Sequence, residues 1–190
     1  IVIVFFAALI AYITVRRRNI FTGIADSISM VPYIVPGSVI GITLLIAFNK
    51  PPILLSGTML IMIIGLVLRR LPYTIRSSVA ILQQIPMSID EAALSLGSSQ
   101  VKTFYKITMP MMAAGLISGA ILSWVTMISE LSTAILLYVG RTKTLPVEIY
   151  TQIIRGNHGI AAALSTILAV LTIISLLIFN KVSRGDDLSM

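Results

Sequence analysis

The sequence has no cysteine and few charged residues, and these two absences define the environment in which the chain can fold. Without cysteine, neither a disulfide framework nor a thiolate metal site is available. Charged residues make up 11% of the 190 residues and hydrophobic residues 57%, whereas roughly a quarter of a soluble domain is charged. Together with a mean hydropathy of +1.00, this composition indicates a protein of the lipid bilayer.

Catalytic residue sets are missing as well. An intramembrane protease needs a serine with a histidine, paired aspartates within spans, or H-E-x-x-H. The single histidine, His158, has no cysteine or aspartate beside it, and Asp90 and Glu91 lie outside the long apolar runs. We therefore expect no catalytic residue and no metal site, with His158 at the start of a helix. An intramembrane enzyme is kept only as a remote alternative.

The chain opens on the apolar run IVIVFFAALIAYITV, with no basic segment before it and no small-residue cleavage site after it. These features distinguish the run from a signal peptide. We interpret it as a truncated transmembrane helix, and expect the chain to be a fragment or the second half of a longer protein.

Stretches free of Asp, Glu, Lys and Arg predict the membrane crossings, because about 20 residues at ~1.5 Å each cross a bilayer core of ~30 Å. Besides the truncated stretch Ile1–Val15, four reach this range: Ser27–Asn49 (23 residues), Pro51–Leu68 (18), Ile107–Ser129 (23) and Gly156–Asn180 (25). We expect an all-α membrane protein with about five transmembrane helices. Leu131–Gly140 is too short to cross and is interpreted as a re-entrant or interfacial piece, or a continuation of the preceding helix.

The net charge of +7 is interpreted as a topological signal. Ten basic residues fall in segments on one side of the membrane: Arg16, Arg17, Arg18, Arg69, Arg70, Arg76, Lys102, Lys106, Lys181 and Arg184. Four fall on the other: Lys50, Arg141, Lys143 and Arg155. The positive-inside rule then places loop 69–106 and the C-terminus in the cytoplasm. Nucleic-acid binding is excluded because these charges are scattered between apolar spans with no recognition motif.

Two G-x-x-x-G stretches, GSVIG at 37–41 and GLISG at 115–119, predict close helix packing. Pro32 and Pro36 would bend the helix near the first stretch. For that stretch, packing and a moving gate helix are both open interpretations.

A short polar-edged helix is predicted in the longest inner loop, within SIDEAALSLGSS. Ser88 and Glu91 form the S-x-x-E pattern of a capping box, in which two side chains bond amides at a helix start. The helix is expected over Ile89–Leu96, ending at Gly97, the residue best suited to the left-handed conformation. Such a helix could simply lie on the membrane surface.

A second helix is predicted directly after this one. The residues SSQ are expected to cap it, and it would run over Gln100–Met109 and end at Pro110. The first helix would present Ala92, Ala93 and Leu96 on one side, where the two alanines allow another surface to approach closely.

EAALSLG, nine residues and ITMP together resemble the signature E-A-A-x-x-x-G, nine residues, I-x-L-P of permease subunits in bacterial ABC importers. The matching residues are Glu91, Ala92, Ala93, Gly97, Ile107 and Pro110. Met109 stands where leucine is usual, a mild change of similar volume. PYIVPGSVIGITLLIAFN, RRLPYTIRSSVAILQQI and ISELSTAILLYV are similar to the permeases of ferric-iron importers, especially the C-terminal half of their fused form.

The resemblance implies a type I ABC importer permease-like helical bundle in the bacterial inner membrane. It implies one permease domain over residues 1–190, with a cytoplasmic coupling loop at 69–110 and an extracytoplasmic segment at 130–157. In that family the coupling helix is seated on a dimer of cytoplasmic ATP-binding subunits. Two permease domains form the path, and an extracytoplasmic binding protein delivers the solute.

The sequence has no G-x-x-x-x-G-K-[ST] motif, so it lacks the usual loop that cradles ATP phosphates. We expect a transport subunit rather than an enzyme, with no cofactor of its own and with ATP bound by the partner. A self-contained channel would need no coupling motif and is disfavoured.

Glu130 follows 23 uncharged residues, and intramembrane carboxylates usually face a cavity or a partner. We expect Glu130, with the hydroxyls of Ser129 and Ser132, to line the substrate path; the alternative is an interfacial loop acid. Glu130 and Glu148 are the acids of the outer region and do not decide the solute. The resemblance favours ferric iron, with sulfate, molybdate, thiamine, polyamine and phosphonate as alternatives.

Overall fold

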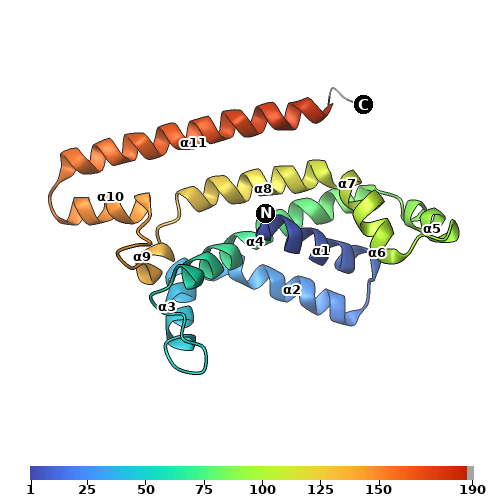
Figure 1. Ribbon diagram of the computed structural model, residues 1–190, viewed down its shortest axis with the longest axis horizontal. Helices are drawn as coiled ribbons and strands as arrows, with labels where there is room; N and C mark the ends of the chain where they lie inside the picture. The colour runs from blue at the N-terminus through green and yellow to red at the C-terminus, as the bar shows by residue number, and fades with distance from the viewer. Residues whose placement is uncertain (188–190) are drawn as a thin grey trace. The chain divides into compact units, whose positions relative to one another are not determined.

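The computed structural model describes the backbone of residues 1–187 and the side chains of residues 1–181, and helices make up most of it (Figure 1). The helical segments are α1 (Val2–Arg16), α2 (Ile20–Ile34), α3 (Gly37–Ala47), α4 (Met59–Gln84), α5 (Met87–Ser95), α6 (Gln100–Thr103), the π-helix η1 (Phe104–Thr108), α7 (Met109–Met111), α8 (Ala113–Ile128), α9 (Ala134–Leu137), α10 (Leu145–Ile154) and α11 (His158–Asp187). The predicted all-α class is confirmed, since residues 1–187 contain no strand. The side chain of Arg184 and the C-terminal residues, predicted to be cytoplasmic, lie outside the described part.

The chain divides into two compact units. Unit 1 comprises Ile1–Met30, Leu71–Ser123 and the end of α11, and unit 2 comprises Val31–Arg70 and Trp124–Val182. The two units are described separately below.

The core of unit 1 forms between α1 and the second half of α4. Ala7, Ala8 and Ala11 are fully buried, because small side chains at helical spacing let two helices approach closely. The buried residues that complete this core are Ile75, Val79, Leu82, Ile85, Phe104, Met112 and Leu116.

The GLISG stretch of α8 packs against α4, as predicted. A Cβ atom at Gly119 would lie 2.7 Å from the Cα atom of Thr74. One turn further on, the hydroxyls of Ser123 and Thr74 are 2.8 Å apart. Only small residues fit along this line of contact.

The core of unit 2 joins α3, the first half of α4, α9 and α10. Its buried residues are Leu44, Ile61, Met62, Ala134, Leu137 and Val147. Gly37 and Gly41 are also buried, and a Cβ atom at either would collide with side chains of Arg69, Thr133 or Leu136. The GSVIG stretch therefore packs closely within unit 2, and its role as a gate stays a prediction.

Helix α4 departs most from the predicted spans. The span was predicted over Pro51–Leu68, but the helix begins at Met59 and continues through Arg69 and Arg70 to Gln84. The predicted boundary at residue 68 is wrong because both arginines have an acidic partner far along the sequence, so charge does not end the helix there.

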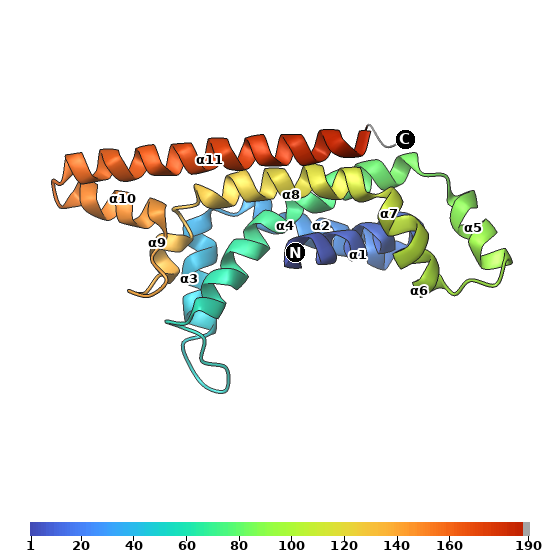
Figure 2. The same cartoon turned by 45° about the horizontal axis from the view of Figure 1, so that its top comes forward.

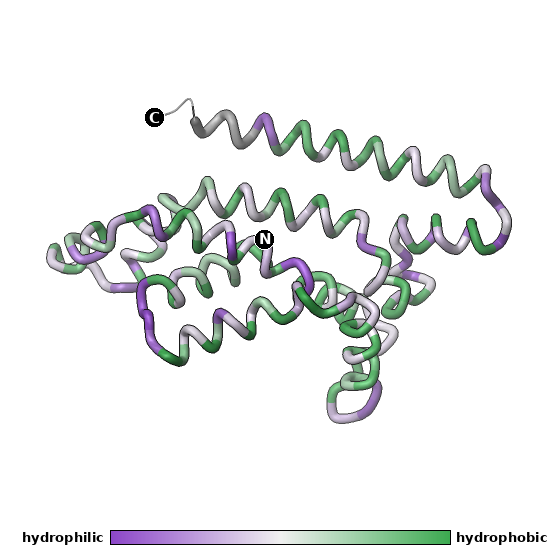
Figure 3. Tube along the Cα trace, turned by 180° about the vertical axis from the view of Figure 1, so that it is seen from behind, coloured by the Kyte–Doolittle hydropathy of each residue, from purple (hydrophilic) through white to green (hydrophobic). Residues whose placement is uncertain are grey.

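One helix in the described part is long and apolar enough to cross a membrane: His158–Lys181 in α11, with 24 residues. Figure 3 shows this helix as mostly hydrophobic along its length. Two more crossings follow if each bent pair is one span: Ile20–Ile34 with Gly37–Ala47, bent by 108°, and Gln100–Met111 with Ala113–Ile128, bent by 69°. By length and composition the described part therefore has one to three spans, and the count of about five stays a prediction.

Candidate functional site

The first candidate site is the segment from α5 to α7 in unit 1 (Figure 2). Helix α5 begins at Met87 after Pro86, whose φ of −58° and ψ of 140° end the preceding segment. Among the described residues, no side chain bonds the first amides of α5, and Ser88 already lies inside the helix. The predicted capping box of Ser88 and Glu91 is therefore wrong, and proline sets the start two residues earlier than predicted.

The end of α5 follows the prediction. Gly97 has a φ of +83°, in the left-handed region that favours glycine. Its amide donates to the carbonyl of Leu94, and the amide of Ser98 donates to that of Ala93, both at 3.0 Å. In the described structure a Cβ atom at Gly97 would meet nothing within 4 Å. The backbone conformation, not a lack of space, therefore requires glycine here.

The second helix starts as predicted but does not end as predicted. The Ser99 hydroxyl accepts from the amide of Lys102 at 3.3 Å and caps α6. The chain then passes through the π-turn η1 and continues into α7 through Pro110. The predicted end at Pro110 is wrong because proline stands in the first turn of α7, where its missing N–H is not needed. The helix axis instead bends after Met111.

The family-motif residues do not share one face. Glu91, Ala92 and Leu96 are exposed, Leu96 at 90%, whereas Ala93 is buried. The prediction that Ala93 lies beside Ala92 and Leu96 on one side is therefore wrong. Large apolar side chains exposed in this segment are Met87, Leu94, Leu96, Val101, Tyr105 and Met111. Outside the bilayer, exposed apolar side chains of this kind are typical of a surface that a partner covers.

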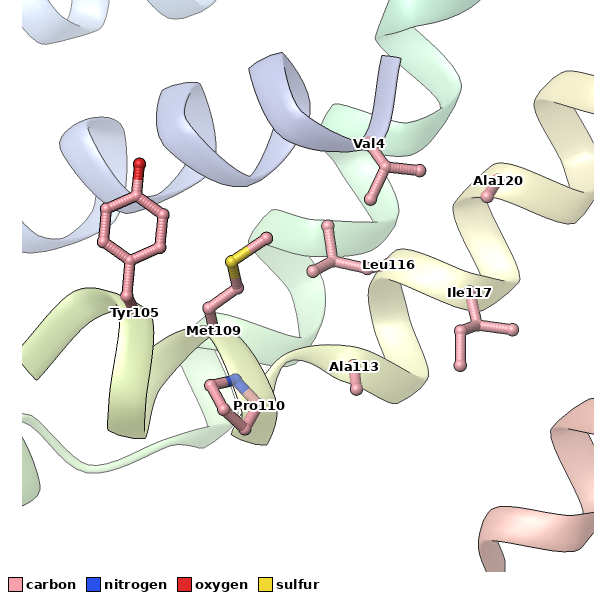
Figure 4. Close-up of a pocket in the computed structure, with 8 residues that line it drawn as sticks. All are labelled: Val4, Tyr105, Met109, Pro110, Ala113, Leu116, Ile117 and Ala120. Carbon is pink, nitrogen blue, oxygen red and sulfur yellow. The ribbon is translucent and has the colours of Figure 1, made fainter. Parts of the chain in front are cut away.

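The end of this segment borders a shallow apolar pocket in unit 1 of about 350 Å³. Tyr105, Met109 and Pro110 form one side, and Val4 of α1 and residues of α8 form the rest, as Figure 4 shows. The motif proline Pro110 thus lines an apolar pocket. The residues that line this pocket include no charged side chain that could bind an ion.

A buried polar cluster behind α5 was not predicted from the sequence. Arg16 at the end of α1 forms an ion pair with Asp90 of α5, with Nε and Oδ2 2.8 Å apart. The Thr108 hydroxyl donates to Oδ1 of Asp90 at 2.7 Å. The only signal in the sequence was the acid directly before the motif glutamate, on the face of α5 that Ala93 shares.

The second candidate site surrounds Glu130 in unit 2. Its carboxylate pairs with Arg70, and with Nε of Arg69 at 3.2 Å. The amide of Thr133 donates to it at 3.0 Å, so the same carboxylate holds the start of α9. Glu130 is 4% exposed, so its carboxylate is buried within unit 2.

The three predicted path residues are separated by exposure. Ser129 and Ser132 are exposed while Glu130 between them is buried. The two serines are therefore accessible from outside the chain, whereas the carboxylate of Glu130 is buried and paired with Arg69 and Arg70. The predicted lining of the path by these three residues is not tested by this arrangement.

The segment after α9 holds one further ion pair. Lys143 Nζ lies 2.5 Å from the carboxylate of Glu148 at the start of α10, and the Gln152 amide donates to the other oxygen at 2.5 Å. The bond from Lys143 and then that from Gln152 hold the pKa of Glu148 below its usual value. His158 is the first residue of α11. In the described part of the chain, no three His, Asp or Glu residues come together as metal ligands.

These observations define a class: an all-helical integral membrane component with an exposed loop motif. The profile of the family described as "Binding-protein-dependent transport system inner membrane component" matches residues 3–185. The chain belongs to this family, which is one of transport permeases rather than enzymes.

Known relatives and structures agree with this assignment. The chain is 34% identical over 175 residues to the ferric transport system permease protein FbpB of Actinobacillus pleuropneumoniae, covering 92% of the chain and 26% of that protein. It is 37% identical over 139 residues to the putative FbpB 1 of Haemophilus influenzae, covering 73% of the chain and 22% of that protein. The chain thus spans about a quarter of the length of these relatives.

The solved structures share the fold. The inward-facing MetNI methionine ABC transporter aligns with a TM-score of 0.72 at 14% identity, covering 97% of this chain and 91% of that one. A bacterial ABC transporter involved in import of the polysaccharide alginate aligns with a TM-score of 0.71 at 16% identity, covering 96% and 71%. The predicted ABC importer permease fold is confirmed.

Proposed function

We propose that this chain forms half of the solute path of an ABC importer and is driven by a separate cytoplasmic ATPase through α5. The observation that carries this proposal is the motif helix itself. It is short, exposed on the face of Glu91, Ala92 and Leu96, and closed by a left-handed Gly97. A helix buried against its own chain could not be seated on another protein.

The partners follow from the family description and the charges. A binding-protein-dependent component takes its solute from an extracytoplasmic binding protein, for which the segment 130–157 is the proposed surface. A second permease domain completes the path, and the ATP-binding dimer supplies the energy because this chain has no phosphate-binding loop. The excess of basic residues supports a cytoplasmic position for α5, even when Arg69 and Arg70 are left out because they pair with Glu130.

Ferric iron is the solute we propose. Both FbpB relatives are named as ferric permeases. Other relatives are named for different solutes, including 2-aminoethylphosphonate in Salmonella paratyphi A and molybdate or tungstate in Pyrococcus abyssi, at 27% and 28% identity. The higher identity to the ferric permeases supports iron. Among the candidate path residues, the exposed Ser129 and Ser132 are those a passing solute could contact, and Glu130 would act through its ion pairs.

Uptake of radioactive iron by cells that lack the gene, with and without the full-length protein, tests this proposal. We expect iron uptake to be restored only when the ATPase gene is also present, and the purified permease alone to hydrolyse no ATP. Restored uptake of molybdate or phosphonate but not of iron would refute the solute. ATP hydrolysis by the permease alone would refute the function.

A further inference from the structure

The buried cluster behind α5 joins four segments of unit 1. Arg16 ends α1, Asp90 lies in the first turn of α5, and Thr108 ends the π-turn η1. Besides its ion pair with Asp90, Arg16 donates from Nη1 to the carbonyl of Ile85 at 3.0 Å. Ile85 is the residue between α4 and Pro86. One guanidinium group therefore holds the point where α4 ends and α5 begins.

Asp90 is the polar anchor of α5. The buried residues of this helix are Asp90 and Ala93. Ala93 offers only a methyl group, whereas both oxygens of Asp90 are used, Oδ2 by Arg16 and Oδ1 by Thr108. The neighbouring acid, Glu91, is exposed on the opposite side. The direction in which α5 presents its exposed face is therefore fixed from behind by Asp90.

The Arg16–Asp90 ion pair is buried, so it opposes separation of α5 from α1. The side chains of Arg16 and Asp90 are 8% and 7% exposed. A buried ion pair is costly to separate because each charge would be left without a partner in a poorly polarisable surrounding. If α5 moves, Arg16 and the end of α1 therefore have to move with it, unless the ion pair between Arg16 and Asp90 breaks.

The π-turn η1 gives the cluster a second mechanical connection. Single π-turns inside helices frequently occur at functional sites, and Thr108 in η1 precedes the Pro110 segment where the chain bends toward α8. Because Thr108 bonds Asp90, a movement of α5 also acts on the bend between α7 and α8.

We propose that Asp90 is the positioning residue of the ATPase-docking helix, and that the Arg16–Asp90–Thr108 cluster transmits the movement of α5 to α1 and α8. This inference rests on the proposed function, in which α5 docks on an ATPase. Within that function it assigns the coupling inside this chain to Asp90, a residue outside the matched motif, rather than to Glu91.

The test uses the full-length protein with its ATPase in lipid nanodiscs, and binding protein purified with its native solute. Asp90→Asn keeps the volume and removes the charge, and Asp26→Asn is the matched control, because it makes the same change in the more exposed Arg76–Asp26 ion pair of unit 1. Arg16→Gln is paired with Arg18→Gln, which alters an exposed arginine. Thr108→Val removes one hydrogen bond and leaves both charges paired, and so gives a milder variant that still folds if Asp90→Asn does not.

Two quantities are measured: ATP hydrolysis with and without binding protein, and the distance between spin labels at positions 13 and 96. Ile13 and Leu96 are exposed, and the 190 residues contain no cysteine to compete for label. We expect Asp90→Asn and Arg16→Gln to reduce stimulation about tenfold, within the range usual for coupling between sites, and to broaden the distance. ATPase retention should stay within about twofold, since the exposed face is intact.

The double variant Asp90→Asn with Arg16→Gln separates positioning from general damage. If the two residues act through each other, it should be less impaired than either single variant, because neither charge is left alone. Equal behaviour of Asp90→Asn and Asp26→Asn, with a working unaltered transporter, would overturn this inference only. The proposed function fails separately if the unaltered protein binds no ATPase. In that case a broadened distance between the labels in Asp90→Asn would show only that Asp90 positions α5, and the role of Asp90 in coupling to an ATPase would be overturned as well.

Discussion

Replacing Gly97 by valine is the sharpest test of the docking helix. At this position the cost of a side chain comes from the backbone alone. A Cβ atom meets nothing within 4 Å in the described structure, and φ is +83°. The left-handed conformation costs an L-residue about 1–2 kcal/mol. That cost makes the turn seen here roughly 5- to 30-fold less populated.

Leaving the turn has a second consequence. The bonds from the amides of Gly97 and Ser98 to the carbonyls of Leu94 and Ala93 would be lost, and α6 would leave α5 in another direction. We expect Gly97→Val to insert in the membrane normally, because insertion depends on the apolar helices. It should bind the ATPase more weakly, by about the same 5- to 30-fold factor, and lose uptake.

Two companion variants make this experiment decisive. Asparagine tolerates the left-handed conformation, so Gly97→Asn should keep most of the binding. Gly23→Val places the same side chain at a glycine of α2 with equally open space and no positive φ, and should change nothing. Pull-down of the ATPase and uptake assays are run on all three. Unchanged binding and uptake in Gly97→Val would mean that α5 and α6 form only a surface loop.

Three further predictions concern the rest of the chain. Glu130→Gln removes the carboxylate that pairs with the buried Arg70 and the partly exposed Arg69 and should cost about 3–5 kcal/mol in thermal unfolding. The exposed Ser132→Ala should change stability by less than about 0.5 kcal/mol; equal melting of the two would refute a stabilising ion pair. Gly119→Val collides with the α4 backbone and should lower stability by about 1–3 kcal/mol; an unchanged melting curve would show that α8 can move aside. The Lys143–Glu148 contact should be present above the ordinary pKa of glutamate and be lost as pH falls through the lowered pKa. The protection factors of amides in the turn before α10, which correct for the intrinsic pH dependence of hydrogen exchange, should therefore fall in acid, and the same profile in Lys143→Met would contradict the assignment.

Local signals in the sequence predicted local structure well. The left-handed Gly97, the Ser99 cap and the apolar span of α11 depend on residues within a few positions, so their patterns can be seen directly. The start of α5 was missed because two patterns overlapped there. Ser88 fits a capping box, but Pro86 two residues earlier fixes the backbone first.

Pairings between distant residues were beyond reach of the same reasoning. The predicted span was defined as a stretch without charged residues, so it ended at Leu68, directly before Arg69. The carboxylate that pairs with Arg70 is 60 residues away in the sequence. No partner was predicted for Asp90 for the same reason, since Arg16 lies at the far end of another helix. Both buried clusters became visible only when the helices were placed in space.

The distance in sequence between Arg70 and Glu130 also sets an order of events during biosynthesis. Chains lengthen at about 5–20 residues per second, so α4 emerges roughly 3–12 s before its acid. During that interval each unpaired arginine at a helix centre costs about 2.5–3.5 kcal/mol to insert. We expect α4 to stay at the membrane surface until Glu130, which follows α8, has been synthesised. The helices α4 and α8 should then insert into the membrane together. Arrest-peptide measurements of pulling force should show one late event for both, and a separate early event for α4 would contradict this order.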